Sequence, residues 1–123
     1  MGVEQLQWLP EATEEEFQAA KSLLRRYRYM SRAAAGLKDL EDLTIKQQCK
    51  LREYSDKTAN IELAVALILD QGVQEITEFV FLKGNDRQAA LNKLRFLTER
   101  SVDRKIRRGV ISVANTLKDW EII

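Results

Sequence analysis

The sequence predicts an all-α fold. Among 123 residues there are only five glycines and one proline, so few positions favour a turn. Charged residues make up 32% of the chain, and apolar residues recur at helical spacing along most of it. We therefore expect an N-terminal region built on a long helix over residues 1–55 and a three-helix C-terminal domain over residues 56–123.

The first predicted helix runs from residue 14 to about residue 35. Thr13 and Glu16 fit the capping-box pattern, and the acidic run at 14–16 suits the positive end of a helix dipole. Gly36 is the expected stop. The arm before this helix, residues 1–12, has an apolar anchor at Trp8 and Leu9. The apolar face of the helix contains Phe17, Ala20, Leu23, Leu24, Tyr27, Met30 and Ala34.

A basic stripe lies beside that apolar face. It consists of Lys21, Arg25, Arg28 and Arg32, which are three or four residues apart. The stripe could contact DNA phosphates, pair with an acidic partner or be solvated.

The middle of the chain has weaker patterns. The spacing over 37–54 fits a second amphipathic helix, and it also fits a solvated linker. Ser55 and Asp56 offer a new capping point. The apolar run Ile61–Leu69 predicts a central helix that ends around Gly72.

Three helices are predicted for the last part of the chain. The first covers 73–82; its FVFL run has β propensity, but no second strand is predicted for it to pair with. Asn85, followed by Gln88, predicts the cap of a helix from Asp86 to about Arg95. The small apolar side of that helix contains Ala89, Ala90, Leu91 and Leu94.

The last predicted helix begins after Thr98, whose hydroxyl can cap it, and reaches Leu117. One face is apolar and contains Val102, Ile106, Val110, Val113 and Leu117. The other side contains Arg100, Ser101, Arg104, Lys105 and Arg108. A helix with a core-facing side and an arginine-rich side has the physical form of a recognition helix.

The charges are segregated along the chain. Residues 85–118 contain nine cations and three anions, whereas the remainder contains eleven cations and sixteen anions. A local positive excess favours phosphate binding, although a solvated helix face gives the same pattern.

Two segments carry a family resemblance: ILDQGVQEITEFVFLKGN (68–85) and LRFLTERSVDRKIRRGVISVANTL (94–117). They look like the C-terminal part of bacteriophage transcription regulators of the ArpU and RinA type, which in turn resemble region four of RNA polymerase sigma factors. The segment LLRRYRYMSR (23–32) is similar to the N-terminal helix of ArpU-type proteins. The resemblance implies a sigma-region-four-like helix–turn–helix domain that binds DNA and controls phage late or packaging genes, without catalysis.

Two departures from that pattern stand out. Arg95 and Phe96 replace the glycine common in the turn. Gly109 lies inside the predicted recognition helix, where glycine lowers helix stability by up to about 1 kcal/mol relative to alanine.

We expect double-stranded DNA as the partner, read in a sequence-specific way. The residues expected near base edges are Arg100, Ser101, Arg104 and Arg108. Those expected at phosphates are Arg87, Lys93, Arg95, Thr98 and Lys105. One three-helix unit reads only a few base pairs, so a homodimer or RNA polymerase is expected to add affinity.

The competing hypothesis is a protein-interaction module. On a sigma-like scaffold it would bind RNA polymerase, a packaging component or a host factor without reading DNA. Asp103 and Ile111 lie among the arginines of the last helix, and this mixed face is compatible with a protein partner. A small DNA-packaging subunit is a further alternative, with its helix–turn–helix expected nearer the N-terminus.

The composition argues against catalysis. Histidine is absent and Cys49 is the single cysteine, which excludes an intramolecular disulfide, the usual zinc sites and a histidine-activated nucleophile. Without a glycine-rich phosphate loop, we expect no enzyme, no cofactor and no metal. No apolar run approaches the roughly 18 residues of a membrane span, so a cytoplasmic location is expected, in the host bacterium if the protein is phage-encoded.

Overall fold

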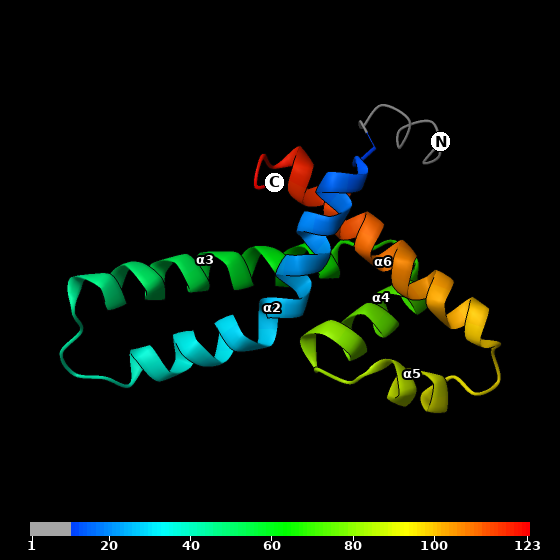
Figure 1. Cartoon of the computed structure of the whole chain (residues 1–123), viewed down its shortest axis with the longest axis horizontal. Coiled ribbons are helices and arrows are strands. Elements are labelled where there is room, and N and C mark those ends of the chain that lie inside the picture. The colour runs from blue at the N-terminus through cyan, green and yellow to red at the C-terminus, as the bar shows by residue number, and fades with distance from the viewer. Residues whose placement is uncertain (1–10) are drawn as a thin grey trace.

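The structure, a computed structural model, describes residues 11–123 (Figure 1). Its elements, in order, are α2 (Glu14–Lys38), α3 (Ile45–Ala66), α4 (Gln71–Thr77), the π-helix η1 (Glu78–Leu82), α5 (Arg87–Lys93) and α6 (Glu99–Asp119). No strand occurs among these described residues, so the all-α prediction is confirmed. The anchor expected at Trp8 and Leu9 lies outside them.

Helix α2 starts at the predicted capping box. The Glu16 N–H donates to Thr13 Oγ1 (3.2 Å), and the Thr13 N–H donates to Glu16 Oε1 (2.8 Å). This second bond lowers the pKa of Glu16, and Lys118 lowers it further. The stop expected at Gly36 is wrong, because α2 continues to Lys38. One glycine inside a helix costs only about 1 kcal/mol, which packing of α2 on α3 can offset.

Helix α3 is one continuous helix. Thr44 caps it in a second capping box, with the Gln47 N–H donating to Thr44 Oγ1 (3.1 Å). The new start expected at Ser55 and Asp56 is therefore wrong, and the division of the chain expected at residue 55 falls inside α3. The amphipathic pattern over 37–54 thus contains the loop and the first half of a longer helix.

The central helix ends earlier than expected. Helix α3 stops at Ala66, and Gly72 lies within α4 instead of terminating the helix before it. Asp70 starts α4, because its carboxylate accepts a hydrogen bond from the Val73 N–H (3.1 Å). Because the run over 61–69 is almost entirely apolar, the sequence pattern did not indicate the end of α3 at Ala66.

The main core joins α2, α3, α4, η1 and α6. In Figure 1, α2 runs antiparallel to α3 and crosses α6 with its N-terminal half. The buried side chains of this core come from residues far apart in the sequence, which makes α2, α3 and α6 one packed body. They are Phe17, Leu24, Tyr27, Met30, Ile61, Ala64, Val65, Ile68, Val73, Phe81, Val110, Val113 and Leu117.

A smaller core joins α4, η1, α5 and α6. It is built on Ile76, Ala90 and Val102. The FVFL run contributes to it as part of η1, not as a strand. Phe79, Val80, Leu91, Leu94, Leu97 and Ile106 pack around it. This cluster fixes α5 and the start of α6 against α4.

The start of α5 differs from the prediction by one residue. Asp86 is the cap, and its Oδ1 accepts a hydrogen bond from the Ala89 N–H (2.8 Å). Asn85 is not the cap, because both its backbone N–H and its side-chain amide donate to the Phe79 carbonyl in the first half of η1. Gln88 instead donates to Asn92, and α5 ends at Lys93, not Arg95.

Gly109 lies where α6 meets α4. A Cβ placed on Gly109 would overlap Thr77 Oγ1 and lie 3.0 Å from Thr77 Cβ. Thr77 is fully buried (0% exposed), and its hydroxyl donates to the Val73 carbonyl (2.7 Å). The glycine therefore permits close packing of the two helices, which explains a residue that otherwise lowers helix stability.

Candidate nucleic-acid interface

Helix α6 begins at the predicted cap. Thr98 Oγ1 accepts a hydrogen bond from the Ser101 N–H (3.1 Å) and donates to Ser101 Oγ (2.9 Å). The predicted apolar face is in the core: Val102, Val110, Val113 and Leu117 are buried, and Ile106 packs partly buried against both clusters. The burial of one face sets which side of α6 points outward.

The outer face of α6 carries three exposed arginines: Arg100, Arg104 and Arg108. They are four residues apart, so about 6 Å separates successive side chains along the helix axis. In residues 11–123, no carboxylate forms an ion pair with any of the three. The outer face therefore presents a row of guanidinium groups available to an anionic partner.

Ser101 and Lys105 lie at the edge of this row. Both are half-buried. The Lys105 ammonium lies beside the first turn of α4, 3.2 Å from the position a Cβ on Gly72 would take. The pKa of Asp70 is lowered, chiefly by the hydrogen bond from the Val73 N–H and also by Lys105 and Arg108. The protein's own carboxylate thus already attracts Lys105.

The turn before α6 supplies further cations. Arg95 is exposed. The Lys93 ammonium lies 5.1 Å from the centre of the Phe79 ring, a cation–π distance. Lys93 is the last residue of α5, and Arg95 lies in the turn before Thr98, so both are close in sequence to the start of α6.

Arg87 is already engaged. Its Nε and Nη2 bind Asp103 Oδ1 and Oδ2 at 2.8 and 2.9 Å, and Glu99 lies 3.7 Å from Nη2. These bonds lower the pKa of Asp103 and raise that of Arg87. Arg87 therefore ties α5 to α6, a structural role that its charge alone did not indicate.

The Asp103 ion pair should make stability depend on pH. The pKa of Asp103 is lowered in the folded state from its ordinary value of 3.8. Asp103 therefore stabilises the fold at a pH above 3.8, and this contribution disappears as the pH falls through the lowered pKa. We expect Asp103→Asn to lower the free energy of unfolding at about pH 7 and to have a smaller effect at about pH 2. Urea denaturation at both pH values measures this difference.

Asp56→Asn is the matched control, because Asp56 is exposed on α3 and forms no ion pair among the described residues. An Asp103→Asn effect that is the same at both pH values would contradict the role given to this ion pair.

An apolar groove lies beside the C-terminal half of the outer face. Its volume is about 500 Å³, and it is lined in part by Leu67, Leu69, Ile111 and Trp120, with Arg108 at one end. Leu69 is 84% exposed. The sequence pattern placed Ile111 among the arginines of the last helix, but it predicted Leu69 to be part of the central helix. Only the early end of α3 reveals that Leu69 is in a surface linker.

Phe96 is a second exposed apolar residue, 78% exposed in the turn between α5 and α6. It lines a smaller hollow with Leu94, Leu97 and Lys105. Its position next to Arg95 makes the turn both basic and apolar.

Comparisons with protein-family models, curated proteins and solved structures return no match for the chain. In the part of the chain that the structure describes, no helix is long and apolar enough to cross a membrane.

Proposed function

We propose that this protein is a sequence-specific double-stranded DNA-binding regulator of transcription. In this proposal α4 with η1, α5 and α6 act as a sigma-region-four-like helix–turn–helix unit, and α6 is the recognition helix. The observation that supports it best is the row of Arg100, Arg104 and Arg108 on α6, which is opposite a buried face and forms no ion pair with a carboxylate in residues 11–123.

The mechanism follows from the dimensions of DNA. The major groove is about 12 Å wide and admits one α-helix, so the outer face of α6 can reach base edges. Arginine binds the O6 and N7 atoms of guanine with two parallel hydrogen bonds. Arg100 and Arg104, in the first half of α6, are the proposed base readers, and Arg108 extends the contact along the groove.

Phosphate contacts position the protein on the duplex. We assign them to Lys93 at the end of α5, to Arg95 in the turn, to the N-terminus of α6 at Thr98, and to Lys105 at the edge of the arginine row. Arg87 has a different part, because its bonds to Asp103 hold α5 at a set angle to α6. The resemblance to ArpU- and RinA-type regulators points to phage late or packaging genes as targets.

A selection from random DNA duplexes tests this function. We expect recovery of a common short motif, and binding to it should weaken about 100-fold between about 50 and about 200 mM salt if about four phosphates are contacted. Recovery of unrelated sequences with no preferred motif would contradict sequence-specific binding.

A protein-interaction module is the second candidate, and the groove at Leu67, Leu69 and Ile111 favours it. RNA polymerase is the partner to test first. In a binding assay, Leu69→Asp should abolish retention of polymerase and Arg104→Ala should not, if the groove is the contact. The reverse result would favour the arginine face of α6.

A further inference from the structure

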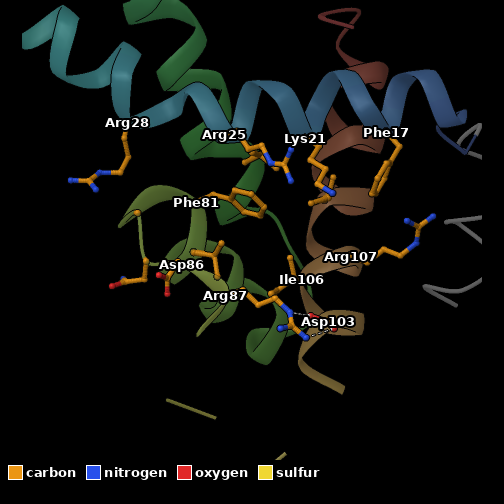
Figure 2. A pocket seen from close by; sticks show the side chains of 15 residues that line it. Phe17, Lys21, Arg25, Arg28, Phe81, Asp86, Arg87, Asp103, Ile106 and Arg107 are labelled. Carbon is orange, nitrogen blue, oxygen red and sulfur yellow. Dashed lines mark hydrogen bonds and ion pairs between the residues drawn. The ribbon is translucent and has the colours of Figure 1, made fainter. Parts of the chain in front are cut away.

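A second basic site lies away from the outer face of α6. It is a pocket of about 610 Å³ between α2, η1 and α6 (Figure 2). Its apolar walls include Phe17, Leu24, Phe81 and Val110, all buried. A volume between about 300 and 1,000 Å³ with mostly apolar walls and a few polar groups is typical of small-molecule sites.

Five cations line this pocket: Lys21, Arg25, Arg28, Arg87 and Arg107. The two carboxylates are already bonded, since Asp103 pairs with Arg87, and Asp86 caps α5 by accepting a hydrogen bond from the Ala89 N–H. In the part of the chain that the structure describes, the other four cations form no ion pair. With five cations and two carboxylates in its lining, the pocket has an excess of positive charge that can attract an anion from outside.

Three of the cations, Lys21, Arg28 and Arg107, contact neighbouring groups. The Arg107 guanidinium lies 4.5 Å from the centre of the Phe17 ring, and the Lys21 ammonium lies 5.9 Å from the same ring. Arg28 packs over Gly84, whose missing Cβ leaves room for the guanidinium. The φ of +75° at Gly84 also favours glycine at this position. In Figure 2, Lys21 and Arg25 extend from α2 toward the side of the pocket where Arg87 and Asp103 lie.

We propose that this pocket binds a small ligand in which a phosphate group is attached to an apolar or aromatic part, the chemical class of nucleotides. Arg25 and Lys21 are placed to bind the phosphate oxygens, since forked guanidinium donors match phosphate geometry. The walls at Phe81 and Val110 would receive the apolar part. Attraction between ions is stronger beside buried apolar walls than in water.

The concave shape favours a small molecule over a duplex. DNA is bound by side chains that project from an exposed face, as on α6, whereas this pocket has the volume of one small ligand. The pocket lies on the side of α6 that carries Asp103 and Arg107, not on the row at Arg104. Ligand binding here can therefore be tested without DNA.

The test is an NMR titration of the full chain with adenosine monophosphate, inorganic phosphate and adenosine. We expect the monophosphate to shift backbone amide signals around Lys21, Phe81 and Arg107, with inorganic phosphate binding at least about tenfold more weakly and adenosine not binding. No shift with the monophosphate up to about 10 mM, or shifts confined to other regions, would overturn the proposal.

Two neighbouring arginines provide a matched pair of variants. Arg25 lines the pocket, and Arg26 is exposed on the same helix outside it. We expect Arg25→Ala to weaken binding of the monophosphate about tenfold or more and Arg26→Ala to change it less than about twofold. Lys21→Gln gives an independent second variant, expected to weaken binding as Arg25→Ala does. Equal losses in the Arg25 and Arg26 variants would show general charge attraction and overturn the site.

Discussion

Arg104→Ala is expected to weaken binding to the selected DNA motif by about 1–3 kcal/mol and to relax the preference for one base pair. Arg104 lies in the middle of the row on α6, with Arg100 one turn before it and Arg108 one turn after it. Its replacement removes two hydrogen bonds to one base while Val102 and Val110 keep α6 in place. Equilibrium binding to the motif and to each single-base variant of it measures both effects.

Arg52→Ala is the control for charge. Arg52 is exposed on α3 and forms no ion pair in residues 11–123, so its replacement removes the same charge from another face. Its effect on DNA affinity should be small and equal for every sequence. A loss of the same size in both variants, with base preference kept, would assign the arginines of α6 to general attraction.

Gly109→Ala is expected to lower the free energy of unfolding by about 1–3 kcal/mol. Alanine is the better helix former by about 1 kcal/mol, so propensity alone predicts the opposite sign. The added methyl group would overlap the hydroxyl of Thr77, which is fully buried between α4 and α6. Urea denaturation followed by far-ultraviolet circular dichroism measures the change.

Gly36→Ala is the matched control, because Gly36 is inside α2 and nothing lies within 4 Å of an added Cβ. It should stabilise the protein by up to about 1 kcal/mol. In a second control, the cost of Gly109→Ala should shrink in a Thr77→Ala background, since that change removes the overlapping hydroxyl and the methyl group 3.3 Å away. Stabilisation by Gly109→Ala would contradict the close packing of α4 and α6.

Two helix starts were predictable from the capping residue. Thr13 was identified from its capping-box partner Glu16 and Thr98 from its hydroxyl, and both cap helices in the structure. Thr44 and Asp70 were missed because an apolar or amphipathic pattern ran past each of them. Asn85 and Asp86 are adjacent, and the side chain of either residue type can cap a helix. The carbonyl of Phe79, which no local pattern reveals, engages Asn85 and leaves the cap to Asp86.

The outward direction of Arg100 and Arg104 could be predicted, because helical periodicity fixes which residues share a face. The pairing of Arg87 with Asp103 could not be predicted, since it depends on the angle between α5 and α6. The same holds for the basic pocket, where Lys21 and Arg107 meet at Phe17 only after α2 crosses α6. Helical periodicity describes each face but not which faces meet.

We propose that Arg104 on α6 reads a guanine in the major groove. The most direct measurement of this contact is a thermodynamic cycle in which each guanine of the selected motif is replaced in turn by 7-deazaguanine, which lacks the N7 acceptor. One of these replacements should weaken binding of the parent protein about tenfold and leave binding of Arg104→Ala unchanged. Equal losses in both proteins at every guanine, or no loss in either, would contradict the claim.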